Sequence, residues 1–161
     1  MLRLALLAVP LALLATSARA ADEAKGEKVE FAVYPGYFEK NTAGLKGDAS
    51  YLVLTNKDSF AKVFALWPPL MKGNKAVPLP EKAFEKQIVA AVVRRGNAIT
   101  TYAVESVTAD GDTITIRYKA ETGPAGTATF ASPLVVAADR GKAKKVAFVE
   151  NGKTVTTVDV K

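Results

Sequence analysis

Hydrophobic positions along most of this chain alternate with polar ones or form short unbroken runs, a pattern typical of β-strands. Residues 29–34 and 50–55 are two short β-favouring runs, and a Pro-Gly turn ends the first. Residues 37–48 are polar and contain glycine, so we expect a loop there. Residues 87–93 (QIVAAVV) are apolar without alternation, which predicts a strand buried on both faces. A turn at 94–97 should follow it.

One segment, residues 56–66, has helical rather than strand periodicity. Its apolar positions and the residue after it recur at spacings of three and four: Phe60, Val63, Phe64 and Trp67. Asn56 or Asp58 can cap the first turn, and Pro68 ends the helix. The aromatic stripe could line a ligand groove, but we favour packing of the whole stripe, Trp67 included, against a sheet.

Two alternating runs flank Ala109-Asp110-Gly111 and predict a β-hairpin. A two-residue Asp-Gly loop would place a glutamate opposite an isoleucine. A three-residue loop with the glycine left-handed instead pairs Tyr102 with Tyr118 and Val104 with Ile116 on one face, so we prefer it. The opposite face then carries side chains suited to water: Ala103, Glu105, Thr115 and Arg117.

The C-terminal part of the chain predicts three more strands. Residues 127–138 form one of them, and Pro133, which has no backbone N–H to donate, marks an edge or a bulge in it. Residues 145–150 and 153–160 surround Asn151-Gly152, the strongest short hairpin signal in the chain. This turn sets Glu150 opposite Lys153 and Phe148 opposite Val155.

Together these elements predict a single, mainly β domain over residues 29–161. The natural architecture is an antiparallel sandwich or a partly open barrel of about eight strands, with the one short helix at 56–66.

Residues 1–20 carry the three parts of a secretory signal peptide. Arg3 gives a positive start, an apolar run follows, and Ala18-Arg19-Ala20 fits a small-x-small cleavage site. The apolar run of about 13 residues is shorter than the roughly 20 that span a bilayer as a helix, and Pro10 interrupts it. We therefore expect cleavage near Ala20, a flexible lead-in over 21–28, no stable membrane anchor, and a periplasmic or secreted product.

The chain has no histidine and no cysteine among its 161 residues. Ser-His-Asp triads, cysteine nucleophiles and the usual zinc sites are therefore excluded, and we expect neither enzymatic activity nor a cofactor or metal. A hydrolase that uses two carboxylates remains an alternative, although none of the 16 Asp and Glu residues falls in a recognisable catalytic pattern. The absence of cysteine also excludes disulfides and lipid attachment, which favours a bacterial envelope protein.

The formal net charge is +6, and it falls to +4 when Arg3 and Arg19 leave with the signal peptide. Most positive residues are dispersed, but one cluster is dense: Arg140, Lys142, Lys144 and Lys145. The cluster could attract an anionic surface or polymer, although we favour a solvated loop between two strands. Without a larger basic stripe and interleaved aromatics, we do not expect a nucleic-acid partner.

Several sequence segments occur in a distinctive order: 60–67 (FAKVFALW), 84–93 (FEKQIVAAVV), 95–97 (RGN), 102–104 (YAV), 123–126 (GPAG) and 132–136 (SPLVV). In this order the region 50–148 resembles the C-terminal domain of the bacterial protease complex subunit PrcB family. The chain departs from that family at Thr100-Thr101, where the family has two glycines, and it lacks the lipid-anchor cysteine of some members.

The resemblance implies a non-enzymatic accessory domain that binds and stabilises a partner protein, which in the founding case is an exported protease. The positions that it carries over as partner-binding residues are Tyr102, Gly126 and Pro133. Each also has a structural interpretation, as a core tyrosine, a turn glycine and a strand-edge proline.

We therefore expect an exported domain that contacts another exported protein. A free sheet edge near Pro133 or at the last strand could accept a partner strand. The alternative is a small-molecule or glycan-binding domain with stacking faces from Tyr34, Tyr37 and Trp67, and this alternative depends on an exposed Trp67.

Overall fold

A computed structural model describes residues 26–68 and 76–161 of the chain. The predicted signal peptide over 1–20 and most of the lead-in over 21–28 lie outside the described residues.

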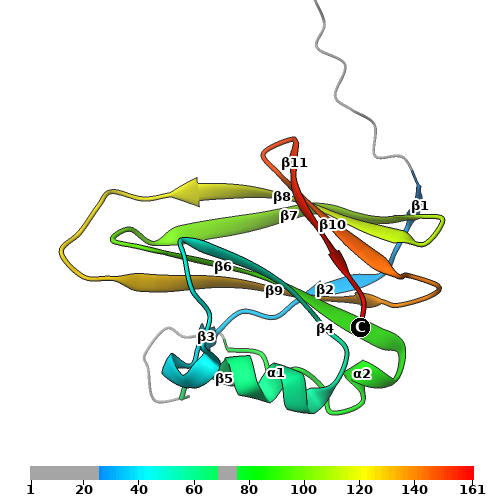
Figure 1. Ribbon diagram of the computed structural model, residues 1–161, viewed down its shortest axis with the longest axis horizontal. Helices are drawn as coiled ribbons and strands as arrows, with labels where there is room; N and C mark the ends of the chain where they lie inside the picture. The colour runs from blue at the N-terminus through cyan, green and yellow to red at the C-terminus, as the bar shows by residue number, and fades with distance from the viewer. Residues whose placement is uncertain (1–25, 69–75) are drawn as a thin grey trace, which may run out of the picture.

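The described residues form three layers (Figure 1). Sheet A has the strand order β1-β7-β8-β10-β11, sheet B has the order β2-β9-β6-β4, and the third layer holds the small β3-β5 sheet with the helices. The strands of sheet A are β1 (Glu27–Lys28), β7 (Thr100–Asp110), β8 (Thr113–Thr122), β10 (Lys145–Glu150) and β11 (Lys153–Asp159). The strands of sheet B are β2 (Phe31–Val33), β9 (Phe130–Asp139), β6 (Gln87–Gly96) and β4 (Ala49–Leu54). The third layer contains β3 (Tyr37–Glu39), η1 (Asn41–Ala43), α1 (Lys57–Val63), β5 (Phe64–Leu66) and α2 (Ala83–Lys86).

This arrangement confirms a mainly β, sandwich-like fold, and the described strands do not close into a barrel. The pairing is antiparallel throughout except between β8 and β10, which run parallel.

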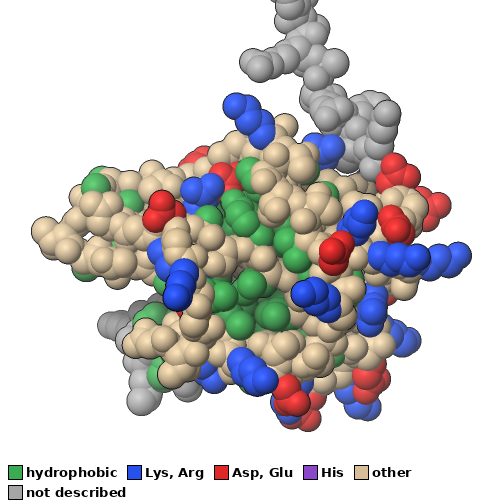
Figure 2. Space-filling view, viewed as in Figure 1, with side chains coloured by type: hydrophobic (Ala, Val, Ile, Leu, Met, Phe, Trp, Pro, Cys, Tyr) green, Lys and Arg blue, Asp and Glu red, His purple; other side chains and the backbone are tan. Residues whose placement is uncertain are grey.

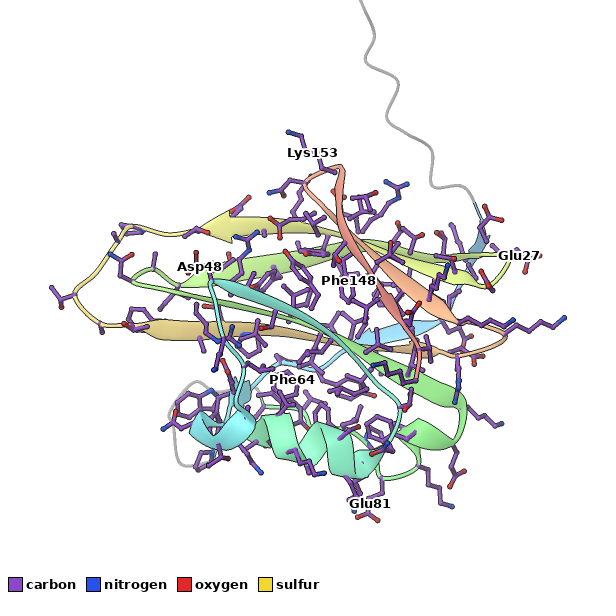
Figure 3. All side chains as sticks on the ribbon, in the orientation of Figure 1. Glu27, Asp48, Phe64, Glu81, Phe148 and Lys153 are labelled. Atoms are coloured by element: carbon purple, nitrogen blue, oxygen red, sulfur yellow. The ribbon has the colours of Figure 1, made fainter. Side chains whose placement is uncertain are left out.

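Sheet B is the middle layer, so its central strand β6 is covered on both faces. Ile88, Ala90 and Val92 of β6 face the core between the two large sheets. The residues between and after them, Val89, Ala91 and Val93, face the core beneath the helices. The two cores lie above and below sheet B in Figure 3, around Phe148 and Phe64 respectively. The prediction from the unbroken apolar run at 87–93 is therefore confirmed. The turn expected at 94–97 is wrong for its first residues, because β6 continues to Gly96.

The predicted helix exists but is shorter than expected. Asn56 caps α1 by accepting a hydrogen bond from the Ser59 N–H (2.8 Å). The helix ends at Val63, because Phe64 becomes extended and β5 pairs with β3. The loop expected at 37–48 is accordingly wrong where β3 and η1 lie. Within the predicted stripe, Phe60, Val63 and Phe64 are buried. The Trp67 side chain lies beyond the helix and is 38% exposed.

The β7-β8 hairpin has neither of the two registers considered from the sequence. Asp110 pairs with Thr113, so the loop is Gly111-Asp112, and Val104 faces Tyr118. A bulge at Glu105 shifts the register by one residue. The bulge lets side chains on both sides of it point into one core: Tyr102, Val104, Val107 and Ala109. The expected solvent face is correct in part, because Ala103 and Glu105 are exposed while Thr115 and Arg117 are half-buried.

The β10-β11 hairpin turns where the sequence predicts. Glu150 pairs with Lys153, and Asn151 (φ 49°) and Gly152 (φ 79°) both adopt the left-handed conformation of a type I′ turn. The second predicted pair is wrong, because Phe148 faces Thr156 instead of Val155. A bulge at this point of the hairpin leaves Val155 without a partner.

Candidate functional site at the open side of the sandwich

One side of the sandwich exposes the outer strand of both large sheets. β4 is the last strand of sheet B and β11 is the last strand of sheet A, and both lie on the side that faces the viewer in Figure 1. The Thr55 hydroxyl donates to the Lys161 carbonyl (2.8 Å) and so ties the end of β4 to the end of the described chain. We call the region between β4 and β11 the open side.

The outer edge of β4 presents unpaired backbone groups. The Arg95 N–H donates to the Asp48 carbonyl (2.8 Å), which fixes which residues of β4 bond to β6. Because hydrogen-bonded pairs alternate in an antiparallel ladder, Ser50, Leu52 and Leu54 bond inward. The N–H and C=O groups that point away from sheet B belong to Ala49, Tyr51 and Val53.

β4 also lacks the features that usually protect a free edge. Its six residues contain no charge and no proline, and its pairing with β6 has no register shift. The other outer strands of the two sheets are better protected: β1 and β2 have two and three residues, and β11 carries a bulge between Lys153 and Asp159. Among the described residues, β4 is therefore the outer strand best suited to pair with another chain.

Apolar side chains lie on both faces of β4. Tyr51 and Val53 pack at the rim of the inter-sheet core, where Val158 and Val160 approach from the other sheet. Leu52 lies on the opposite face, in the core beneath the helices. Figure 2 shows hydrophobic side chains at the middle of this side of the molecule, in hollows between the layers. A strand added to β4 would therefore find apolar contacts on both of its faces.

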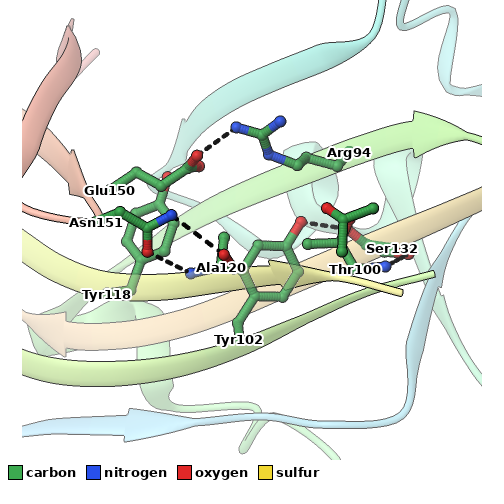
Figure 4. A network of polar contacts seen from close by, with 9 residues as sticks. Arg94, Thr100, Tyr102, Tyr118, Ala120, Ser132, Glu150 and Asn151 are labelled. Atoms are coloured by element: carbon green, nitrogen blue, oxygen red, sulfur yellow. Dashed lines mark hydrogen bonds and ion pairs between the residues drawn. The ribbon is translucent and has the colours of Figure 1, made fainter. Parts of the chain in front are cut away.

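A polar network closes the Ala49 end of the open side (Figure 4). The Arg94 guanidinium of β6 reaches across to the Glu150 carboxylate of β10, and the Tyr118 hydroxyl donates to the second carboxylate oxygen (3.1 Å). The Glu150 side chain is only 12% exposed, so removal of Arg94 would leave a carboxylate charge in a poorly solvated place. The network thus joins sheet A to sheet B, and both oxygens of its carboxylate are already engaged.

A second group of hydrogen bonds ties the same two sheets together. The Tyr102 hydroxyl donates to the Ser132 carbonyl (2.9 Å), and the Thr100 N–H donates to the Ser132 hydroxyl (3.0 Å). Within sheet A, the Asn151 side chain bonds the backbone of Ala120 on β8 through both its oxygen and its nitrogen (3.0 and 3.2 Å). These contacts hold the end of the sandwich in a fixed geometry.

The surroundings of the network keep its tyrosines neutral. Burial raises the pKa of Tyr102 to about 12. Burial, reinforced by the Glu150 carboxylate, raises the pKa of Tyr118 well above its ordinary value. The hydrogen bond to Glu150 raises the pKa of Arg94 as well. Both tyrosines are therefore hydrogen-bond donors at neutral pH.

The three residues that the family resemblance singled out lie toward this end of the sandwich but do not form one cluster. Tyr102 donates its hydroxyl to the Ser132 carbonyl, and Pro133 directly follows Ser132 in the chain. Gly126 lies in the β8-β9 loop, where its N–H donates to the Asn97 carbonyl (2.6 Å). Pro133 pairs with β6 but lies beyond the part of β9 that β2 covers, as expected for a strand edge.

The aromatic residues of the glycan alternative are also dispersed. Tyr37 is buried, and its hydroxyl oxygen accepts a hydrogen bond from the Leu79 N–H (2.8 Å), while Tyr34 is half-buried. Trp67 is exposed, and its ring centroid lies 4.9 Å from that of Phe38. Of the three predicted stacking faces, Trp67 alone is well exposed.

Sequence reasoning expected a free edge near Pro133 or at the last strand, and it did not identify β4. The strand itself was predicted, but its position at the border of sheet B depends on the order of strands far apart in sequence. The absence of charge over 49–54 is the one local signal that could have suggested an edge open to pairing.

Within the described ranges, no group of three or more His, Cys, Asp or Glu side chains is placed to hold a metal ion. No helix in the same part of the chain is long and apolar enough to cross a membrane. No family model, curated protein or solved structure that was compared matches the chain. The resemblance to the PrcB family therefore stays a prediction.

Proposed function

We propose that this chain is an exported, non-enzymatic binding domain that takes up an extended segment of another exported protein along the outer edge of β4. The observation that carries the proposal is the uncharged, bulge-free edge with apolar side chains on both faces. Strand addition of this kind gains affinity from main-chain hydrogen bonds and specificity from pockets for alternate side chains.

The geometry of the edge restricts the partner segment. Its backbone would bond to the outward groups of Ala49, Tyr51 and Val53, so about five residues suffice. Alternate side chains would contact Tyr51 and Val53 on one face and Leu52 on the other. We therefore expect an uncharged segment with apolar residues on both faces. The Thr55–Lys161 hydrogen bond would limit how far the segment extends.

Two arguments from the sequence support the class of partner. The predicted signal peptide over 1–20 would place the domain among envelope or secreted proteins. The resemblance to the PrcB family favours an exported protease, which the domain would stabilise by holding one of its segments in a fixed conformation.

Cross-linking from the β4 edge tests this proposal. The chain has no cysteine, so an Ala49→Cys variant of residues 21–161 can carry one benzophenone label next to the edge. The matched control is Lys119→Cys, which carries the label on an exposed side chain of β8. With an envelope extract of the producing organism, we expect a discrete adduct from position 49 and not from position 119, joined to an extended apolar segment of the partner.

A second substitution separates strand addition from simple proximity. Val53→Pro removes an outward N–H without breaking the ladder to β6, and Val53→Ala shortens the same side chain but keeps the N–H. In the labelled protein, the proline variant should lose the adduct and the alanine variant should keep it. Equal adduct yields in the two variants, or equal yields from positions 49 and 119, would contradict the proposal.

A glycan-binding domain is the second candidate, because Trp67 is exposed beside Phe38. It ranks second because the burial of Tyr37 leaves it with fewer stacking faces than the sequence suggested.

A further inference from the structure

A pocket of about 230 Å³ lies in the helical layer. This layer covers the face of sheet B that points away from sheet A (Figure 1). The floor of the pocket is apolar and mostly aromatic, formed by Tyr37, Phe60, Phe64, Leu66, Leu79 and Phe84. These residues come from β3, α1, β5, α2 and the segment before α2, so separate elements converge on it. The pocket plays no part in the strand addition proposed above.

The rings of the floor are arranged around Phe60. Its ring centroid lies 5.1 Å from that of Tyr37 in an edge-to-face arrangement, 5.3 Å from Phe64 and 6.0 Å from Phe84. An apolar cavity of about 150 Å³ is already large enough to hold benzene. This pocket therefore has room for one aromatic ring and a short polar end.

The mouth of the pocket carries one charge of each sign. The Lys57 ammonium at the start of α1 and the Glu81 carboxylate before α2 both line the pocket, with 2.8 Å between Nζ and Oε1. Their side chains are 66% and 84% exposed, and such an exposed ion pair contributes little to stability. Their hydrogen bond raises the pKa of Lys57 and lowers that of Glu81, so both are charged at neutral pH. The pair can open without disturbing the fold.

We propose that this pocket binds a small aromatic zwitterion of the α-amino acid class. The aromatic ring lies against Phe60 and Phe84, the ligand ammonium contacts Glu81, and the ligand carboxylate contacts Lys57. One exposed protein ion pair is thereby replaced by two ion pairs above a desolvated ring. A purely apolar ligand would leave the Lys57–Glu81 pair in place across the mouth and gain only the ring contacts.

Binding can be measured by ¹⁹F NMR with 4-fluoro-L-phenylalanine as the probe. We expect saturable binding with a Kd on the order of 0.1–1 mM, typical of a ligand of this size. L-Phenylalanine should displace the probe, whereas 3-phenylpropionate lacks the ammonium and 2-phenylethylamine lacks the carboxylate. Each of these two should bind about three- to tenfold more weakly than L-phenylalanine, as expected for the loss of one partly exposed ion pair. Toluene should bind more weakly still.

Charge-neutral variants assign the two contacts. Lys57→Gln should weaken L-phenylalanine but not 2-phenylethylamine, and Glu81→Gln should weaken L-phenylalanine but not 3-phenylpropionate. The matched controls, Lys62→Gln and Glu85→Gln, remove the same charges from neighbouring exposed positions that do not line the pocket, and they should change no affinity. The proposal is overturned if the probe shows no saturable binding up to about 10 mM. It is overturned equally if all four ligands bind alike or if the control variants weaken binding as much as the pocket variants.

Discussion

Phe148→Ala is expected to lower the free energy of unfolding by about 3–5 kcal/mol, because it removes a large ring from the centre of the inter-sheet core. The Phe148 side chain is 1% exposed, and its ring centroid lies 5.4 Å from that of Tyr51 on β4. The surrounding strands are fixed by their ladders and cannot collapse into the space. A loss of this size is a large part of the 5–15 kcal/mol that stabilises a typical domain.

Urea unfolding followed by circular dichroism measures the effect. The matched control is Val155→Ala on the neighbouring strand β11, where the side chain is 41% exposed and lies at the bulge. That substitution should cost less than about 0.5 kcal/mol. If Phe148→Ala cost as little as the control, the sandwich core could not lie where sheets A and B place it.

Stability is expected to fall steeply above pH 10, because the buried Tyr118 and the half-buried Tyr102 must keep their protons in the folded state. Burial raises the pKa of Tyr102 to about 12, and burial together with Glu150 raises that of Tyr118. Below pH 10 the two tyrosine hydroxyls are protonated in both the folded and the unfolded chain, so they add no pH dependence to stability. Above pH 10 the unfolded chain releases these protons first, so each tyrosine can remove up to about 1.4 kcal/mol per pH unit until its folded-state pKa is reached.

Phenylalanine variants isolate this effect from the titration of lysines. Tyr102→Phe and Tyr118→Phe should each be less stable than the parent at pH 7, by about 1 kcal/mol for the lost hydrogen bond. Both should lose less stability than the parent between pH 10 and pH 12. The control is Tyr34→Phe, whose hydroxyl is outside the network and which should follow the parent. Parallel curves for all four proteins would show that Tyr102 and Tyr118 are not held in a poorly solvated network.

Features of the fold with a local cause could be predicted from the sequence. The Asn151-Gly152 turn was predictable because a type I′ turn requires two left-handed residues, a conformation that Asn and Gly adopt at low cost. Residues 87–93 were predictable because a strand covered on both faces carries an unbroken apolar run instead of an alternating one. A cap by Asn56 or Asp58 was predictable because it depends on local sequence alone, and in the structure Asn56 is the residue that accepts the N–H of Ser59.

Features that depend on distant partners could not be predicted. The bulge at Glu105 changes the register of β7, but no glycine marks it in the sequence, and its cause is the shared core on both sides of it. Phe64 leaves the helical pattern because β3 offers it a strand partner. Trp67 becomes exposed as a consequence of that change.

The candidate site has the same limitation. Arg94 and Glu150 meet across the sandwich from positions 56 residues apart, and the free edge of β4 exists only because sheet B ends there. The family resemblance singled out Tyr102 and Pro133 in the sequence. In the fold, the Tyr102 hydroxyl donates to the carbonyl of Ser132, the residue directly before Pro133. For residues 49–54, the absence of charge was the one local signal of an open edge, and it does not determine where the strand lies in the sheet.

Amide hydrogen exchange along β4 tests the central claim, which is that the outer edge of this strand accepts a partner strand. In the free protein, Ser50, Leu52 and Leu54 should exchange slowly and Ala49, Tyr51 and Val53 rapidly, because only the first set bonds to β6. In the cross-linked complex, the rapid set should slow at least about tenfold, as their amides gain hydrogen bonds. Unchanged exchange at these three amides, with new protection along β11 instead, would contradict the account.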